Sequence, residues 1–387
     1  MRYTVERSKT LLVDGPASVT LLSGETEILG ANFREGERVV IRDGKRVPFE
    51  VIKKAVFDLR LGENPCFKEV DGTTIPISWE NAFKEVMSQE RPVIVMVIGG
   101  VDSGKTSFCV YLANRLLRDG LRPAVIDGDL GQSDLGPPST IGFSHVTKPL
   151  RDLFEMEAEK VSFVGVTSPS PAVNKVVETL TAMKSRVLQT DADSLIVNTD
   201  GWVEGEEAVR YKVQLAEMVA PNIVIGIQQT DELKPILTLL KEKRRVIAIE
   251  SPQVIRRRNR EKRKTLRELG YKKYLKGAKV RLFHLSQITV EDALSETGGR
   301  LAMEEMEGIE EGLLVALQDA ERNFLGIGVL CGVDSTRGAM RIYTPVGENV
   351  STVCVGQVKL DREGRETGLG PVATQLLEPK QNLLHPT

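Results

Sequence analysis

Apolar and polar positions alternate differently in three successive stretches of the chain. In residues 10–75, short β-prone runs are separated by turn signals such as Asp-Gly and Ser-Gly, which is typical of a small antiparallel sandwich or barrel. In residues 93–250, longer apolar strands alternate with helical stretches, as in a doubly wound α/β sheet. After residue 280, short strands return. The pattern predicts three domains: an N-terminal β-rich domain (1–75), an α/β domain (76–285) and a smaller C-terminal β-rich domain (286–387).

The α/β stretch contains six apolar, mostly β-branched runs that we predict to be strands. They are residues 93–98, 123–127, 161–166, 194–198, 223–227 and 246–250. Right-handed crossovers bring the carboxyl ends of such strands to one edge of the sheet. The residues that follow each strand are therefore expected to converge on one site.

Composition indicates a globular protein with a sizeable core. The 387 residues are 41% hydrophobic and 27% charged, and this length favours two to three domains. We expect no membrane segment and a cytoplasmic location, or a nuclear one in a eukaryote, because no apolar run is long enough to span and the amino terminus lacks a signal-peptide core. The net charge of −2 gives no overall attraction to nucleic acid, so any such binding requires a local basic patch.

The sequence Gly-Gly-Val-Asp-Ser-Gly-Lys-Thr directly follows the first of these strands and precedes a predicted helix at 107–117. It matches G-x-x-x-x-G-K-[ST], the phosphate-binding P-loop. Lys105 is expected to reach the β- and γ-phosphates of ATP, and Thr106 to present its hydroxyl to Mg²⁺. The residues predicted to bind the nucleotide are Gly99, Gly100, Val101, Asp102, Ser103, Gly104, Lys105, Thr106 and Ser107.

Two carboxylates, Asp127 and Asp129, stand at the end of the second predicted strand. Beside a P-loop, one such carboxylate can serve the metal while the other takes a proton from an attacking hydroxyl. Asp129 is the candidate base. Asp127, Asp129 and Thr106 are the candidate Mg²⁺ ligands, and Gln132 could orient a phosphate or a water. The alternative is an Asx-rich turn that merely closes the strand.

These motifs resemble those of the Clp/Grc-type polynucleotide 5′-hydroxyl kinases, the group that contains the RNA kinase of the eukaryotic pre-mRNA cleavage complex and its archaeal relatives. The resemblance rests on the P-loop, on residues 127–132 and on Gly-Pro-Pro at 136–138, and it covers nearly the whole chain. It implies a P-loop NTPase parallel-sheet core flanked by the two β-rich domains. It also implies that Asp129 acts near the metal and the attacking hydroxyl.

Two further segments resemble the part of this family that holds the acceptor strand. Residues 198–202 match Asn-Thr-x-Gly-Trp, and the resemblance assigns Trp202 to the clasp on the acceptor nucleotide. Residues 167–174 are similar to a Ser/Thr-Pro-x-x-Asn segment, which makes Ser170 and Asn174 candidates for acceptor binding. From the residues alone, a core tryptophan and a helix cap at Ser170 are the alternatives.

A basic run occupies residues 256–267, after the last predicted core strand. Such runs are usually solvated helix faces or nonspecific polyanion sites. A helix through the run would place four arginines on one face: Arg256, Arg260, Arg263 and Arg267.

The position of this run also resembles the family's lid helix, which carries arginines before a Tyr-x-x-Gly ending. Alignment on Tyr274 and Gly277 makes Arg258 and Arg263 the catalytic candidates, with Arg267 next as a substrate-binding residue. A lid of this kind can stabilise the charge that develops on a transferring γ-phosphoryl group.

Together these features predict transfer of the γ-phosphate of ATP, with Mg²⁺, to the 5′-hydroxyl of single-stranded RNA, in RNA processing; DNA is an open second acceptor. One alternative is an ATP-binding scaffold or switch subunit of an RNA-processing complex that does not turn ATP over. The other is an ATPase that uses water, for which Gln132 and residues 228–231 could serve, although 228–231 lack a guanine-reading pattern. Protein partners cannot be named from the sequence.

Overall fold

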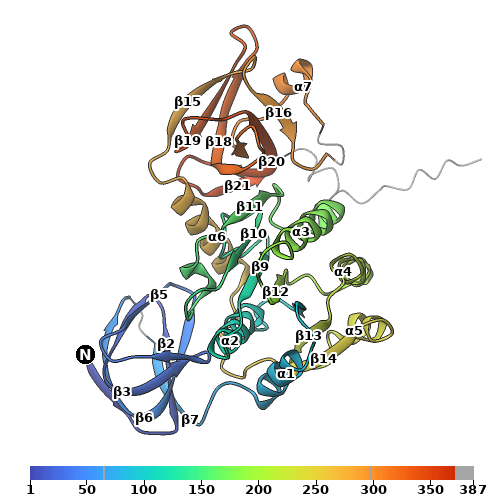
Figure 1. The fold of residues 1–387 in the computed structure, drawn as a ribbon. Coiled ribbons are helices and arrows are strands. Elements are labelled where there is room, and N and C mark those ends of the chain that lie inside the picture. The colour runs from blue at the N-terminus through green and yellow to red at the C-terminus, as the bar shows by residue number, and fades with distance from the viewer. Residues whose placement is uncertain (64–65, 296–298, 371–387) are drawn as a thin grey trace, which may run out of the picture. The chain divides into compact units, whose positions relative to one another are not determined.

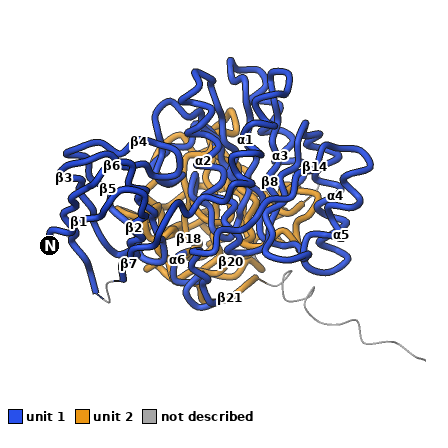
Figure 2. The backbone as a smooth tube through the Cα atoms, turned by 90° about the horizontal axis from the view of Figure 1, so that it is seen from below, with its two compact units in different colours: residues 1–136, 141–160, 177–266 blue, residues 137–140, 161–176, 267–387 orange. Residues whose placement is uncertain are grey.

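The computed structural model describes residues 1–63, 66–295 and 299–370. The chain packs into two compact units, which Figure 2 colours separately. The first comprises residues 1–136, 141–160 and 177–266, and the second comprises residues 137–140, 161–176 and 267–387. The three-domain division at residues 75 and 285 stays a prediction.

An antiparallel sheet forms the N-terminal part of the first unit, drawn in blue in Figure 1. Its strands are β1 (Arg2–Val5), β2 (Lys9–Asp14), β3 (Ala17–Ile28), β4 (Ala31–Phe33), β5 (Arg38–Ile41), β6 (Arg46–Leu61) and β7 (Phe67–Asp71). Their order is β4-β3-β6-β2-β7, with β1 beside β6 and β5 beside β3. Along β6, Val47, Phe49 and Val51 are buried while the residues between them are more exposed, so one face of the strand lines the core.

The second sheet of this unit carries the P-loop. Its strands are β8 (Val93–Gly99), β9 (Pro123–Gly128), β10 (Thr140–His145), β12 (Ser194–Thr199), β13 (Ile223–Gln228) and β14 (Arg245–Glu250), in the order β10-β9-β12-β8-β13-β14. Strands β9, β12, β8, β13 and β14 are parallel, as predicted. Strand β10 is antiparallel to β9 and was not predicted, because Gly142 and Ser144 interrupt its apolar pattern. The core sheet is therefore mixed.

The helices of the first unit are α1 (Ile77–Met87), α2 (Lys105–Arg118), α4 (Glu206–Val219) and α5 (Lys234–Lys241), with the short η1 (Leu153–Glu155). Most of α3 (Val173–Val187) and the first half of α6 (Arg260–Tyr274) also belong to it. Helix α2 begins two residues before the predicted start, because the P-loop glycine at position 104 is its N-cap.

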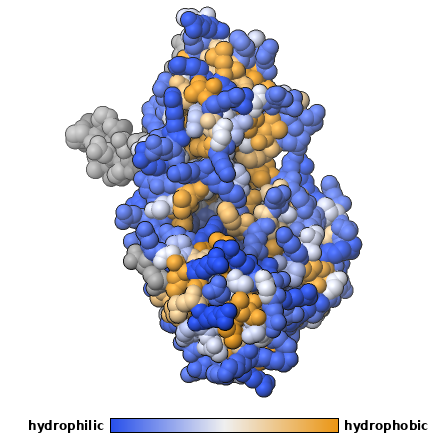
Figure 3. Space-filling view, turned by 90° about the vertical axis from the view of Figure 1, so that its left-hand side faces the viewer, coloured by the Kyte–Doolittle hydropathy of each residue, from blue (hydrophilic) through white to orange (hydrophobic). Residues whose placement is uncertain are grey.

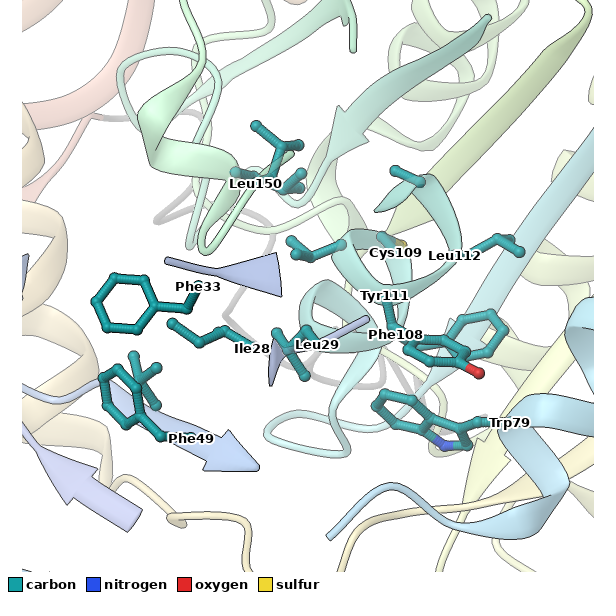
Figure 4. Close-up of a cluster of buried hydrophobic side chains, with 14 of the residues drawn as sticks. Ile28, Leu29, Phe33, Phe49, Trp79, Phe108, Cys109, Tyr111, Leu112 and Leu150 are labelled. Carbon is teal, nitrogen blue, oxygen red and sulfur yellow. The ribbon is translucent and has the colours of Figure 1, made fainter. Parts of the chain in front are cut away.

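One hydrophobic cluster joins the N-terminal sheet to the P-loop helix (Figure 4). Trp79 of α1 packs edge-on against Phe108 of α2, with ring centroids 5.1 Å apart. Asn114 of α2 donates from Nδ2 to the carbonyl oxygens of Leu29 (2.9 Å) and Leu150 (2.8 Å). The first sheet is thus fastened directly to the helix that follows the P-loop.

The second unit is built on a C-terminal sheet. Its strands are β15 (Lys279–His284), β16 (Thr289–Asp292), β17 (Leu313–Gln318), β18 (Phe324–Asp334), β19 (Ala339–Thr344), β20 (Thr352–Leu360) and β21 (Glu366–Leu369), and the unit also holds most of β11 (Lys160–Phe163), η2 (Ser170–Ala172) and α7 (Met303–Glu307). The order is β15-β19-β18-β17-β20-β16, with β21 beside β20. Tyr271 and Leu275, near the end of α6, pack into its core with Ala316 and Ile327. The predicted C-terminal β-rich region is confirmed.

The surface carries apolar side chains singly or in small groups. The face drawn in Figure 3 is mostly hydrophilic, with separate apolar patches. Ile77 and Val40 are the most exposed large apolar residues of the described chain, at 78% and 69%. Among the residues that the structure describes, no helix is long and apolar enough to cross a membrane.

Candidate active site

The P-loop connects β8 to α2 and depends on its glycines. Gly104 has a φ of 100°, and a Cβ atom on Gly99 would lie 2.4 Å from Ser103 Oγ. Lys105 Nζ donates to the carbonyl oxygens of Gly99 (2.9 Å) and Gly100 (2.8 Å), so this side chain lies along the loop. Burial lowers the pKa of Lys105, and the charge of a nearby aspartate opposes that shift.

The same loop offers unused donors to an anion. Helix α2 has no acidic residue in its first turn, and Gly104, its N-cap, has no side chain to cap the helix. Ser103 Oγ is buried and has no hydrogen-bond partner. Free N–H groups at a helix N-terminus, together with a hydroxyl and a lysine, are the donors that a phosphate group binds. The residues present therefore fit the triphosphate of a nucleotide.

Asp127 closes the loop that follows β9 and is 1% exposed. Its Oδ1 accepts a hydrogen bond from Asn198 Nδ2 at 2.9 Å, and its Oδ2 accepts one from Asp134 N at 2.7 Å. Burial, with the charges of Asp134 and Asp129, raises the pKa of Asp127 to about 7. Because protein donors hold both oxygens, Asp127 shapes the loop, and its metal-binding role stays a prediction.

Asp129, two residues later, has less of its carboxylate engaged. Its Oδ1 accepts from the backbone N–H groups of Gly131 (3.1 Å) and Gln132 (3.0 Å), so the Asx turn weighed above is present. Burial raises the pKa of Asp129, while the positive charge of Lys105 opposes the shift. A carboxylate with a raised pKa is better suited to accept a proton, so the turn and the role of base are compatible.

The residues after β12 pack directly on the P-loop. A Cβ atom on Gly201 would lie 2.7 Å from Val101 Cγ2 and 2.9 Å from Val101 N, so this position requires glycine. Trp202 is half-buried, and its ring stacks on Tyr211 with centroids 5.6 Å apart and planes at 25°. The core tryptophan of the protein is Trp79, which is 1% exposed. Trp202 is therefore partly exposed, and it directly follows the glycine that packs on the P-loop.

A buried ion pair next to Trp202 was missed by the sequence reasoning. Asp200, within the segment resembling the acceptor clasp, binds Lys212 of α4, with Nζ 2.8 Å from Oδ2. The available signal was the position of Lys212 on the face of α4 that also carries Ala208 and Leu215, both completely buried. A lysine on an apolar helix face must find a buried acceptor.

The two arginines predicted to be catalytic contact the P-loop and the loop after β9. Arg258 donates to Asp102 from its backbone N (2.8 Å) and Nε (2.7 Å), and Arg263 NH1 lies 3.6 Å from Asp102 Oδ2. Gln132 Oε1 accepts from Arg258 NH1 at 3.4 Å, and Gln132 Nε2 donates to Arg263 O at 3.2 Å. The structure thus brings Arg258, Arg263 and Gln132 together.

The prediction of one arginine face is wrong for Arg256, because α6 begins only at Arg260. The side chain of Asn259 accepts a hydrogen bond from Lys262 N at 2.7 Å, so the helix starts there and Arg256 precedes it. Arg267, in the second unit, donates to Glu366 from Nε at 2.6 Å and from NH2 at 2.8 Å. Its role in substrate binding stays a prediction.

For three other predicted residues, the structure gives a position, and their roles stay predictions. Thr106 lies in the first turn of α2. Ser170 begins η2, and Asn174 lies in the first turn of α3. Both of these acceptor-binding candidates belong to the second unit.

Known proteins are similar to the part of the chain that contains this site. Residues 99–277 match the family model described as the mRNA cleavage and polyadenylation factor CLP1 P-loop. A polyribonucleotide 5′-hydroxyl-kinase of Methanocaldococcus jannaschii is 26% identical over 79% of this chain and 98% of its own. One from Pyrococcus furiosus is 27% identical over 76% of this chain and 95% of its own.

A eukaryotic relative and a solved structure also match this chain. A CLP1 homologue of Nematostella vectensis is 23% identical over 70% of this chain and 67% of its own. The structure of a wild-type Clp1p–Pcf11p complex matches with a TM-score of 0.72, covering 93% of this chain and 97% of that one at 14% identity, which shows a shared fold. The P-loop, the loop after β9 and the basic segment all fall inside the matched region. Over residues 99–277 this chain is therefore similar to the CLP1 P-loop family, and over most of its length it is similar to the archaeal polyribonucleotide 5′-hydroxyl kinases.

Proposed function

We propose that this protein transfers the γ-phosphate of ATP to the 5′-hydroxyl end of single-stranded RNA. The observation that carries the proposal is the convergence of three segments at one edge of the sheet. Asp129 follows β9, the P-loop with Lys105 follows β8, and Trp202 follows β12, the strand between them. The charge of Lys105 acts on the carboxylate of Asp129 and opposes the rise of its pKa. A phosphate-binding loop alone would serve any nucleotide site. A carboxylate and a partly exposed tryptophan at the same edge of the sheet supply what an acceptor strand needs.

In this reaction the 5′-oxygen of the acceptor forms a bond to the γ-phosphorus as the bond to the β–γ bridging oxygen breaks. Asp129 accepts the hydroxyl proton, through the carboxylate oxygen that its own turn does not use. Lys105 leaves the carbonyl oxygens of Gly99 and Gly100 and binds the phosphate oxygens. Arg258 and Arg263 stabilise the negative charge on the transferring group, and ADP leaves with the remaining phosphates.

The residues of the site also fit Mg²⁺. Among the described residues, no group of three or more His, Cys, Asp or Glu could hold a metal ion. Mg²⁺ at phosphate sites is usually bound by one or two protein oxygens, several waters and the phosphates themselves. Thr106 and Asp129 supply such oxygens. When bound, Mg²⁺ neutralises charge on the β- and γ-phosphates.

A second candidate function, an ATP-binding scaffold without turnover, is favoured by one observation. Lys105 is bound to loop carbonyls and Arg258 to Asp102, so both cations already have protein partners in the structure. A kinase must exchange these contacts for phosphate oxygens during each reaction. A scaffold that binds ATP must also release Lys105, but it could keep the pair of Arg258 with Asp102.

The proposal is tested with γ-labelled ATP, Mg²⁺ and a 5′-hydroxyl oligoribonucleotide. Labelled oligoribonucleotide is expected from the wild-type protein, and Asp129→Asn should lower kcat about 10²–10⁴-fold, the usual contribution of a general base. Asp231→Asn, which changes an exposed acid in the loop after β13, is the matched control and should keep the wild-type rate.

Unlabelled RNA with stable ATP binding would overturn the kinase and support the scaffold. Phosphate release at the same rate with and without oligonucleotide would instead indicate an ATPase. Full activity of Asp129→Asn would remove only the assignment of the base. Competition between RNA and DNA strands of the same sequence would then define the acceptor.

A further inference from the structure

Helix α4 carries a lysine that is completely buried. Lys212 is 0% exposed, and its Nζ donates to Asp200 Oδ2 (2.8 Å), Asp200 O (3.0 Å) and Thr199 Oγ1 (3.3 Å). Removing two charges from water is expensive, and their attraction often does no more than offset that cost. The phosphoryl transfer described above uses neither residue. Burying this pair therefore costs free energy, and no role described so far accounts for it.

Asp200 is the centre of this cluster. In addition to Lys212, its Oδ2 accepts a hydrogen bond from Tyr211 Oη at 2.7 Å. Its Oδ1 accepts one from the backbone N–H of Trp202 at 2.9 Å. Both oxygens are thus occupied, and they tie two consecutive residues of α4 to the segment that follows β12. We name Asp200, Tyr211 and Lys212 the support cluster.

Trp202 is attached to the support cluster in two ways. Its backbone is fixed by Asp200, and one face of its ring is covered by Tyr211, which is 1% exposed. The residue as a whole is partly exposed. Since Gly201 packs against Val101 of the P-loop, the position of this ring relative to the phosphate site is set by the same segment.

We propose that the support cluster positions Trp202 as a rigid stacking platform for the 5′-terminal base of the acceptor strand. The inference rests on the proposed function, because it assumes that RNA is the acceptor. An aromatic ring held in its bound orientation loses little conformational freedom when a base stacks on it, and this improves affinity. Lys212 balances the charge of Asp200, which would otherwise repel the phosphates of RNA.

Intrinsic fluorescence can test the proposal without phosphoryl transfer. The protein has two tryptophans, and Trp79 is buried, so quenching by a 5′-hydroxyl oligoribonucleotide in the absence of ATP reports on Trp202. Loss of one hydrogen bond in Tyr211→Phe, which keeps the ring, should raise the RNA dissociation constant about 3-fold. Asp200→Asn should raise it about 10-fold or more, because a buried cation loses its partner. The dissociation constant for ATP should stay within about 2-fold in Tyr211→Phe, which changes neither a P-loop donor nor a charge that acts on Lys105.

A double-mutant cycle distinguishes positioning from general stability. In a Trp202→Ala background, followed by a labelled oligoribonucleotide, both substitutions should leave RNA affinity unchanged, because the platform through which they act is gone. Arg210→Gln, which removes an exposed ion pair with Glu206 on the same helix, is the control and should bind as the wild type does. If Asp200→Asn does not fold, Tyr211→Phe carries the test alone.

The proposal is overturned if RNA does not quench the wild-type fluorescence, or if Tyr211→Phe weakens RNA binding equally with and without Trp202. Its failure is separable from that of the kinase. Normal labelling of RNA with unaltered quenching in the variants would refute the platform only, whereas RNA-dependent quenching without labelled product would refute the transfer reaction only.

Discussion

The loop after β9 and the segment before and within α6 both contribute to the candidate site, but they are held in different ways. In the loop, Asp127, Leu130 and Leu135 are at most 2% exposed, and backbone N–H groups bind the carboxylates. In the basic segment, the side chains of Arg256 and Arg263 are 40% and 29% exposed. Arg256 NH1 lies 3.8 Å from a carboxylate oxygen of Asp14, and Arg263 NH1 lies 3.6 Å from one of Asp102. The first region is part of the core, and the second is attached to it by ion pairs.

This difference has an energetic consequence. Leaving a buried donor without its acceptor costs about 1–3 kcal/mol. In the basic segment the carboxylates of Asp14 and Asp102 are also buried, at 7% and 5% exposure, but the arginines that bind them remain partly exposed to water. The arginines can therefore exchange these carboxylates for phosphate oxygens at a lower cost than the loop would incur by rearranging. A base must stay at one position through the reaction, and a lid must release and close. The two regions suit these two tasks.

The largest effect is expected from Asp127→Ala in the loop. The substitution leaves the side chain of Asn198 and the N–H group of Asp134 without acceptors, so unfolding free energy should fall by about 2–3 kcal/mol. For a domain of this size that lowers Tm by about 6–10 °C. Displacement of Asp129 should also lower kcat about 100-fold. Thermal unfolding and initial rates measure both quantities.

Asp119→Ala, at the exposed C-cap of α2, is the control for that experiment. If Asp127→Ala unfolds at the wild-type temperature and only its Mg²⁺ requirement rises, Asp127 is a metal ligand, and the contrast between the two regions is lost.

In the basic segment, Arg258→Lys should affect kcat more than it affects stability. Lysine keeps the charge but not the planar pair of donors with which Arg258 binds Asp102, and it cannot bind a phosphoryl group in the same way. We expect kcat to fall about 10–100-fold. Because Asp102 is only 5% exposed and loses part of its hydrogen bonding, the unfolding free energy should fall by about 1–2 kcal/mol. Arg257→Lys, at the exposed neighbouring position, should leave kcat unchanged. A large fall in Tm with an unchanged kcat would make Arg258 structural.

The sequence was informative where one local rule decides the structure. Continuous apolar runs such as 93–98 predict buried parallel strands, and the P-loop motif fixes the turn and the start of α2 within two residues. Asp129 and Trp202 could also be located, because each follows a predicted strand at the same sheet edge.

The rest depends on partners that are distant in the sequence. Strand β10 has a broken apolar pattern and is held by its pairing with β9. Arg256 lies outside α6 because Asn259 caps the helix, a preference that the spacing of arginines alone does not report. The pairing of Arg258 with Asp102 joins positions 156 residues apart, and nothing local to either position selects it.

A pH-dependent effect is expected where the loop meets the N-terminal sheet. Asp152 binds Arg42 NH2 at 2.8 Å and Lys45 Nζ at 3.4 Å, and both cations also bind Asp134 of the loop. Although burial opposes them, the charges of Lys45 and Arg42 lower the pKa of Asp152 to about 2. A lowered pKa gives stability above the unfolded-state value, near 3.8, and that stability is lost as the pH falls toward 2.

Asp152→Asn should therefore be less stable than the wild type at pH 6, by on the order of 1–2 kcal/mol, and the gap should narrow between pH 4 and pH 2. Urea unfolding of both proteins across this range measures it. A gap of the same size at every pH would show that the carboxylate charge contributes nothing, and that the loop is not tied to the first sheet by these ion pairs.

The smallest effect is expected at the exposed arginines of the basic segment. Arg256 and Arg260 lie outside the cluster formed by Arg258, Arg263 and Asp102, so they are placed to meet the acceptor strand by charge rather than to touch the transferring phosphoryl group. Replacing both with glutamine should raise KM for RNA about 3-fold at low salt, with kcat and KM for ATP unchanged. Loss of the Arg256–Asp14 ion pair should lower the unfolding free energy by at most about 1 kcal/mol. Each lost phosphate contact should also reduce the slope of log KM against log salt by about 0.7. Because screening removes such interactions first, wild type and variant should become equal at high salt. A fall in kcat comparable with that of Arg258→Lys would place these arginines on the triphosphate. All arginines of the segment would then take part in catalysis, and the distinction between Arg258 and the more exposed arginines would be lost.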